Sequence, residues 1–141
     1  MVLSLIKSSQ TSERIYSIVR GCDENQLIHT DVYYVKSILN NLLTNAIKYA
    51  VPESLIEFKV EALRQGDQSK IVFAVSNEVV PESAPNPDLV FQRYYRAEMA
   101  KQQSGAGLGL WLAQSMAHAL GTEIHYVNQA NTVTFHFAIR V

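Results

Sequence analysis

Apolar residues recur at intervals of three and four between residues 32 and 47, which is the period of an α-helix with one buried face. That stripe consists of Val32, Val35, Ile38, Leu39, Leu42, Leu43, Ala46 and Ile47. Thr30 or Asp31 can cap the start of such a helix, and Pro52 ends it. The pattern therefore predicts a long helix that begins near residue 31 and ends at about residue 50.

Two further segments predict helices by the same spacing. Residues 11–20 open with Thr and Ser, carry three aliphatic residues at helical intervals and are followed by Gly21. Residues 108–120 return to helical periodicity after a glycine-rich stretch and end at Gly121. Glycine directly after a periodic segment is a common helix stop.

The remaining apolar segments predict strands. They are residues 26–30, 55–64, 70–76, 123–128 and 132–140. This order of helices and strands favours an α+β class, a two-layer α/β sandwich with about three helices on one face of a mixed, five-stranded sheet. Between the third and fourth strands, residues 77–87 hold three of the four prolines, which predicts a surface loop.

Composition narrows the class of protein. A chain of 141 residues with 48% hydrophobic and 18% charged residues fits one globular domain. The net charge is -1 and no basic stripe appears, so we expect no nucleic-acid partner. Cys22 is the single cysteine, which excludes an internal disulfide, and no apolar run reaches the roughly 18 residues of a membrane span. We expect a soluble domain without membrane contact.

Three polar residues of the long helix could carry chemistry. Asn41, Asn45 and Lys48 follow at steps of four and three, so their side chains project from one narrow face. A solvated helix face explains this spacing equally well. The alternative is that Asn45 offers a neutral oxygen to a hard cation such as Mg²⁺, which is bound mainly by phosphates and water.

Glycines alternate at Gly105, Gly107 and Gly109, directly before the helix of residues 108–120. Glycines let backbone amides approach a phosphate, and a helix N-terminus favours negative charge. A flexible hinge or a tight helix entry would explain the same glycines. Just upstream, Arg93 and Arg96 suit phosphate oxygens, although arginines on an ordinary surface have the same spacing.

Read in order, three segments resemble known sequence boxes. ILNNLLTNAIKYA at 38–50, VFQRYYR at 90–96 and SGAGLGL at 104–110 are similar to the N box, F box and second glycine box of bacterial sensor histidine kinases. The resemblance covers residues 26–140 and implies the Bergerat ATP-binding fold. It makes residues 1–141 a single catalytic domain, with residues 1–25 as a helix or linker from a dimerisation domain that is absent.

The resemblance also implies residue roles in binding ATP and Mg²⁺. Asn45 corresponds to the magnesium ligand, Asn41 and Lys48 lie near the phosphates, and Tyr49 lies against the adenine. Arg93 and Arg96 steady the outer phosphates, so that Asn41, Lys48 and the two arginines form the catalytic set. The residues that close over the triphosphate are Gly105, Gly107, Leu108, Gly109 and Leu110.

One box departs from the family pattern. Its first glycine box reads Asp-x-Gly-x-Gly, whereas this chain reads NEVVP from Asn77 to Pro81. Asn77 takes the place of the aspartate that accepts a hydrogen bond from the adenine amino group, and an amide oxygen can accept that bond without charge assistance. Glu78, Val79 and Val80 carry side chains where the family has small residues, which predicts a different loop path.

The resemblance implies a phosphotransfer function. Relatives that hydrolyse ATP have a glutamate base at the position of Asn41, and an amide cannot take a proton from water. We therefore expect the domain to present the γ-phosphoryl group of Mg-ATP to a histidine on a separate dimerisation domain, and indirectly to serve a response regulator. None of the four histidines here has the context of that phosphoacceptor.

Two alternatives remain open at this stage. A degenerate pseudokinase would bind ATP weakly and act as a scaffold, and a serine kinase of the anti-sigma type shares the fold, although the F box argues against it. For the main hypothesis we expect a monomeric domain in the cytoplasm, in a full-length protein that is either soluble or anchored in the inner membrane.

Overall fold

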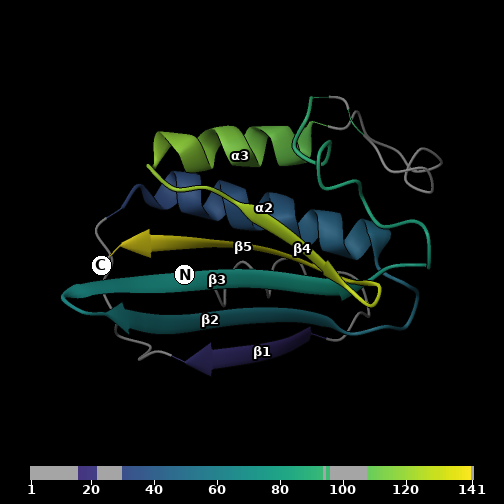
Figure 1. Ribbon diagram of the computed structural model, residues 1–141, viewed down its shortest axis with the longest axis horizontal. Coiled ribbons are helices and arrows are strands. Elements are labelled where there is room, and N and C mark those ends of the chain that lie inside the picture. Colours follow the sequence, from purple (N-terminus) through teal and green to yellow (C-terminus); the bar gives the residue numbers. More distant parts are fainter. Residues whose placement is uncertain (1–15, 22–29, 94, 96–107, 141) are drawn as a thin grey trace.

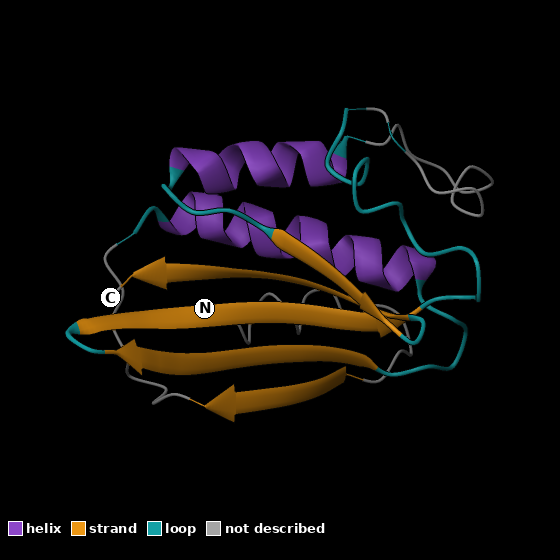
Figure 2. Ribbon diagram, in the orientation of Figure 1, coloured by secondary structure: helices purple, strands orange, loops and turns teal. Residues whose placement is uncertain are grey.

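The fold has two layers, a sheet and a pair of helices that lie together on one side of it (Figures 1 and 2). The structure is a computed structural model that describes residues 16–21, 30–93, 95 and 108–140. Its elements are β1 (Tyr16–Gly21), α2 (Val32–Tyr49), β2 (Ile56–Gln65), β3 (Gln68–Glu78), α3 (Gly109–Ala119), β4 (His125–Gln129) and β5 (Thr132–Arg140). The predicted α+β sandwich is confirmed.

Helix α2 forms where the apolar stripe predicted it. The Asp31 side chain accepts a hydrogen bond from the Tyr34 amide at 3.3 Å, which caps the first turn. At the other end, the Ala50 amide donates to the Ala46 carbonyl at 3.0 Å, so the helix ends before Pro52. Val32 lies in the first turn and is 47% exposed, so the buried stripe begins at Val35.

The sheet is mixed, as expected. Its strand order is β1-β2-β3-β5-β4, with β1 parallel to β2 and every other neighbouring pair antiparallel. A tight turn with Gly66 at a φ of 61° joins β2 to β3, a conformation that glycine adopts without strain. The chain therefore brings β3 to the centre of the sheet, where both of its neighbours run antiparallel to it.

The expected first helix is wrong for residues 16–20. These residues form β1, which pairs with β2 from Tyr16 opposite Ile56 to Gly21 opposite Glu61. The β-branched residues of this segment favour a strand, and pairing satisfies the backbone groups along the free side of β2. A segment of ten residues is too short for its periodicity to separate the two states.

Among the described residues, the fifth strand of the sheet is β1. Residues 26–29 of the strand predicted at 26–30 lie outside the described residues, and Thr30 is a bend directly before α2. About three helices were expected, and the described part of the chain contains α2 and α3. Neither of these is long and apolar enough to cross a membrane.

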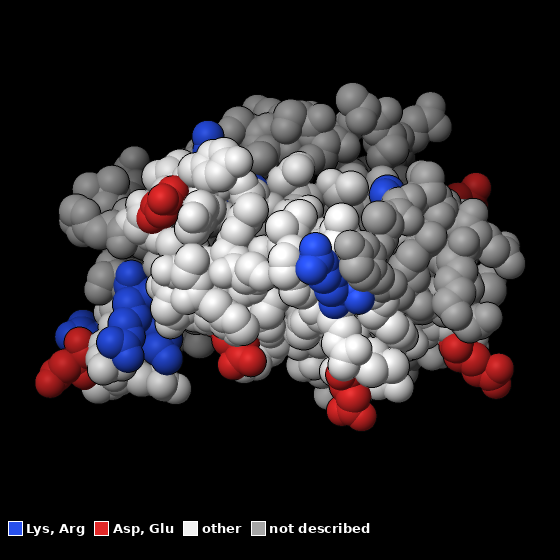
Figure 3. All heavy atoms as spheres, turned by 90° about the horizontal axis from the view of Figure 1, so that it is seen from above, with Lys and Arg blue, Asp and Glu red and all other residues white. Residues whose placement is uncertain are grey.

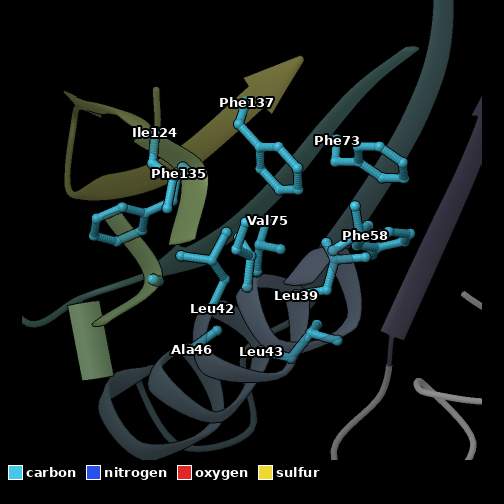
Figure 4. Packing of buried hydrophobic residues seen from close by; sticks show 14 of the residues in the cluster. Leu39, Leu42, Leu43, Ala46, Phe58, Phe73, Val75, Ile124, Phe135 and Phe137 are labelled. Atoms are coloured by element: carbon cyan, nitrogen blue, oxygen red, sulfur yellow. The ribbon is translucent and has the colours of Figure 1, made fainter. Parts of the chain in front are cut away.

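The core lies between the sheet and the helices (Figure 4). Leu39, Leu42 and Leu43 of α2 are at most 1% exposed, and they meet alternate side chains of the central strands. Phe73 and Phe137 stack there with ring centroids 5.1 Å apart. Each such side chain stabilises the fold by roughly 1.5–3 kcal/mol through burial, so this layer holds the two helices in place.

Backbone hydrogen bonds connect the segments at the end of the sheet where α2 and β3 end. The Val51 amide, just after α2, donates to the Glu78 carbonyl at 2.9 Å. The Val79 amide donates to the Asn131 carbonyl in the β4–β5 turn at 2.8 Å. The end of α2, the end of β3 and the final hairpin therefore meet at one end of the sheet, where α3 also begins (Figure 1).

Candidate functional site

The face of α2 that carries the three candidate polar residues is directed in part at α3. Asn41 is half-buried, and its Nδ2 donates to the Ser37 carbonyl one turn earlier at 3.0 Å. This bond orients the amide. A Cβ atom at Gly109 would lie 3.4 Å from Asn41 Oδ1 and would meet nothing else within 4 Å. The amide oxygen of Asn41 therefore lies beside the first residue of α3.

No side chain among the described residues caps the start of helix α3. Leu108 occupies the cap position and makes no side-chain hydrogen bond, and the first turn contains no acidic residue. The backbone amides of that turn are oriented along the helix axis with a positive end outward. An anion placed there would meet these amides without competition from a carboxylate on the same turn. Leu108 and Leu110 are half-buried at this point.

Arg93 reaches the same turn from the loop after β3. Its guanidinium carbon lies 4.9 Å from the ring centroid of Trp111, the third residue of α3. Two residues earlier, Phe91 packs edge-on against Phe135 of the core, with ring centroids 6.0 Å apart. This anchor holds the segment in place beside α3. The first turn of α3 thus lies next to both α2 and Arg93.

The other candidates on α2 lie further along the same face. Asn45 is half-buried, and no described residue makes a hydrogen bond with its side chain. Lys48 is exposed and Tyr49 is half-buried. No group of three or more His, Cys, Asp or Glu side chains able to hold a metal occurs within the described residues. A lone neutral amide oxygen fits Mg²⁺ that takes its remaining ligands from phosphates and water.

Asn77 is placed differently from the residues of α2. It lies on the helix-facing side of β3, where it continues the alternation of Ile71, Phe73 and Val75, and is 3% exposed. Its cross-strand neighbours Ile56 and Val133 are also buried. The Asn77 Nδ2 donates to the Glu78 carbonyl at 3.3 Å, and no described residue donates to its amide oxygen.

The loop after β3 begins later than expected. Asn77 and Glu78 still belong to the strand, so the loop starts at Val79. Val79 is 5% exposed and fills space at the base of this loop, while Val80 is 43% exposed. The backbone amide of Val79 ties the start of the loop to the β4–β5 turn by donating to the Asn131 carbonyl.

Two tyrosines that were not singled out in the sequence hold this loop. The Tyr126 hydroxyl donates to the Pro85 carbonyl at 2.9 Å, and the Asn86 amide donates to the Tyr95 hydroxyl at 3.0 Å. Burial and the nearby Tyr95 raise the pKa of Tyr126 to about 12, so its hydroxyl stays a neutral donor. Hydrophobic periodicity predicts elements and not hydrogen bonds between a strand and a loop, which is why the pattern did not indicate these contacts.

Three predicted site residues cannot be placed. Arg96, Gly105 and Gly107 lie outside the described residues. Basic side chains among the described residues form separate groups on the face drawn in Figure 3 and no continuous stripe.

Comparison with known proteins agrees with this arrangement. Residues 30–141 match the family model described as histidine kinase-, DNA gyrase B-, and HSP90-like ATPase. Sensor histidine kinase WalK of Bacillus subtilis is 25% identical over 96% of this chain and 23% of its own length. Histidine protein kinase SaeS of Staphylococcus aureus is 30% identical over 88% of this chain and 38% of its own length.

Solved structures of histidine kinases share the fold. The catalytic domain of histidine kinase ThkA matches with a TM-score of 0.75 and 21% identity, over 98% of this chain and 86% of that one. Full-length ShkA in complex with AMPPNP matches with a TM-score of 0.68 and 20% identity, over 99% of this chain and 30% of that one.

The chain belongs to the histidine kinase-, DNA gyrase B-, and HSP90-like ATPase family, and membership of this family implies that it binds ATP. Within the family, the relatives described above are sensor histidine kinases. The chain spans about a quarter to two fifths of their length, which makes it comparable to one domain of such a protein.

Proposed function

We propose that this chain is the catalytic domain of a sensor histidine kinase, which holds Mg-ATP between α2 and α3 and presents its terminal phosphoryl group to a histidine on a separate dimerisation domain. The observation that carries this proposal is that Asn41 Oδ1 lies beside Gly109, 3.4 Å from where a Cβ atom would stand. It brings two sequence boxes that are far apart in the chain to one point of the fold. Full-length ShkA, which shares this fold, was solved with a nucleotide analogue.

The role that we propose for each residue follows from its position between α2 and α3. The backbone amides at the start of α3 bind phosphate oxygens, and Arg93 beside Trp111 steadies the outer phosphates together with Arg96. Asn45 contributes a neutral oxygen to Mg²⁺, which neutralises phosphate charge when bound. Lys48 lies near the phosphates from the next turn of α2, and Tyr49 and Asn77 lie on the adenine side.

Asn41 separates transfer from hydrolysis. Its amide donates to the Ser37 carbonyl and has no titratable group, so it cannot remove a proton from water. Phosphoryl transfer needs in-line placement and charge neutralisation more than covalent chemistry from the protein. A site of this kind suits a nucleophile that is positioned by another domain. We therefore propose transfer to histidine, with slow hydrolysis when that domain is absent.

The proposal extends to the setting of the domain. It acts as a monomer in the cytoplasm, where ATP is available, and it reaches a response regulator indirectly through the phosphorylated histidine. The named relatives are sensor kinases, which supports this placement.

The first test is thermal unfolding of the 141-residue chain with Mg-ATP. At about 100 times the dissociation constant, a ligand that binds the folded state raises the free energy of unfolding by roughly 2.7 kcal/mol. The absence of any shift at millimolar Mg-ATP would favour a pseudokinase scaffold.

The second test separates kinase from ATPase. Mixed with the dimerisation domain of its own full-length protein and labelled ATP, the chain should transfer label to a histidine of that domain. Without that domain, release of inorganic phosphate should stay near background. Rapid hydrolysis that is lost in Asn41→Ala would contradict the assignment.

A further inference from the structure

Two histidines lie side by side on the open face of the sheet, the face that neither α2 nor α3 covers (Figure 1). His125 is the first residue of β4 and is directly opposite His136 of β5 in the antiparallel register. Phe135 and Phe137 on either side of His136 are buried in the core, so the imidazole of His136 points away from the helices. His125 is exposed and His136 is half-buried. The pair is therefore accessible to solutes and lies apart from the proposed nucleotide site.

The separation of the two rings fits shared coordination of one metal ion. Their centroids are 5.2 Å apart and their planes are inclined by 27°. A bond between a metal ion and an imidazole nitrogen is about 2.0–2.1 Å long, so two rings that share one ion at a tetrahedral angle have centres roughly 5 Å apart. The terminal torsion of a histidine has broad minima, so the exposed ring of His125 can turn a nitrogen toward the ring of His136. Side-chain rotation is sufficient, because the backbone already holds the rings at this separation.

The surroundings leave the ring nitrogens available. No described residue makes a hydrogen bond or an ion pair with either imidazole. Ala74 of β3 is opposite His136 on its other side, and its methyl group leaves space beside the ring. The next residue in this cross-strand row is Lys59, whose charge is partly offset by Glu61 at 3.4 Å. Burial and then the charge of His125 lower the pKa of His136, which favours the neutral ring that a metal ion requires.

We propose that His125 and His136 together bind one divalent transition-metal ion of the zinc, nickel or copper class on the open face of the sheet. Imidazole nitrogens suit these ions, whereas Mg²⁺ prefers oxygen ligands, so the ion that accompanies ATP does not compete for this site. Water occupies the remaining coordination positions, which stay open to a donor from another molecule. The bound ion joins the start of β4 to β5. An ordinary cross-strand packing contact is the alternative, and it binds no ion.

The test is a titration of the untagged 141-residue chain with Zn²⁺ at neutral pH, without nucleotide. Calorimetry measures the dissociation constant, and NMR of the imidazole nitrogens locates the ion. The ring signals of His125 and His136 should shift together as Zn²⁺ is added, while those of His118, an exposed histidine on α3, should stay in place. Because a ligand that binds the folded state stabilises it, Zn²⁺ should also raise the melting temperature.

The variants His125→Gln and His136→Gln each remove one metal ligand and keep a polar side chain in its place. Each should weaken Zn²⁺ binding by at least about tenfold, since changes that only disturb the support of a metal ligand already cost that much. Neither should change the affinity for Mg-ATP. His118→Gln is the matched control, and it should bind Zn²⁺ as the wild type does.

The outcomes decide the proposal in either direction. Weaker binding in both strand variants, with His118→Gln unchanged, supports the site. Equal Zn²⁺ affinity in the wild type and both strand variants overturns it, because the ion is then bound elsewhere. Ring signals of His125 and His136 that stay in place at millimolar Zn²⁺ also overturn it, and this result counts even if a variant fails to fold. No step involves a nucleotide, so failure of this inference leaves the proposed function standing, and failure of the proposed function leaves this inference standing.

Discussion

The two sides of the candidate site are built in different ways. On the proposed phosphate side, Asn41 of α2 lies beside Gly109 of α3, and both belong to segments that resemble the family's boxes. On the proposed base side, Asn77 lies at the end of a central strand, in a segment where Val79 and Pro81 stand at the two glycine positions of the family pattern. In our proposal phosphate binding relies on backbone amides and a metal, so it needs a particular backbone shape. Base recognition relies on one side chain, so its chemistry can change while the strand stays intact.

That contrast predicts different sensitivities. A change on the phosphate side should affect binding of any nucleoside triphosphate, whereas a change on the base side should alter the choice of base. A change on the opposite face of the sheet, which no described helix covers, should affect stability and not nucleotide binding. The predictions below follow in order of decreasing expected effect.

The largest effect is expected from Asn45→Ala. Removal of a neutral oxygen ligand should weaken binding of Mg-ATP by about 100-fold, at the upper end of losses seen when support for a metal site is removed. Calorimetry with and without Mg²⁺ measures it. Asn40→Ala is the control, because Asn40 is an exposed asparagine on the same helix, and it should bind Mg-ATP as the wild type does. Equal losses in the two variants would mean that the helix, and not a ligand, was disturbed.

Asn77→Leu should uncouple binding from stability. The leucine cannot hydrogen-bond adenine, so affinity for ATP should fall by about tenfold. A buried amide whose oxygen has no donor among the described residues is replaced by an apolar group of similar size, so the free energy of unfolding should stay equal or rise by about 1 kcal/mol. Urea denaturation and calorimetry of the same sample give both quantities. A strongly destabilised variant with unchanged affinity would place Asn77 in the core as a structural residue.

Trp111→Leu tests how Arg93 is held. The leucine keeps an apolar side chain on α3 but removes the aromatic ring beneath the guanidinium. An exposed cation–π contact is worth about 0.5–1 kcal/mol, so ATP affinity should fall by roughly two- to fivefold. Affinity for ATP and for inosine triphosphate should fall by the same factor, because phosphate contacts do not read the base. A change in their ratio would contradict this division of the site.

The smallest effect is expected on the open face of the sheet, where the rings of His125 and His136 stack with centroids 5.2 Å apart. Burial and then the charge of His125 lower the pKa of His136. The unfolded chain therefore binds more protons, so stability is complete above about pH 6.5 and declines as the pH falls below it.

Replacement of this histidine should remove that part of the pH dependence. His136→Gln should flatten the fall of the melting temperature between pH 7 and pH 5, measured by calorimetry, with Mg-ATP affinity at pH 7 unchanged. An identical decline in wild type and variant would show that His136 is not responsible.

The helices on the proposed phosphate side were largely predictable from the sequence, because their residues follow a strong periodicity. Asn41 and Asn45 follow the stripe of α2, and the Leu108–Leu120 segment begins at the glycines. The spacing of residues alone could not predict that Asn41 and Gly109 lie side by side in the fold, since they are far apart in the chain. It required the order of the boxes that the resemblance supplied.

The base side and the edge of the sheet were harder to predict. Asn77 continues the alternation of Ile71, Phe73 and Val75, and a strict reading of that alternation would have placed it inside the strand and buried. The loop signal from the prolines obscured it. For β1, pairing with β2 decided the structure, and local sequence contains little information on a partner that is 40 residues away.

The most direct test of the central claim is a heteronuclear NMR titration of the chain with Mg-ATP, following side-chain amides and the glycine backbone. If the nucleotide lies between α2 and α3, the signals of Asn41, Asn45, Asn77 and Gly109 shift together, while those of the exposed Asn40 and Asn128 stay in place. Saturating Mg-ATP that moves Asn40 and Asn128 and leaves Gly109 and Asn45 unmoved would contradict the account.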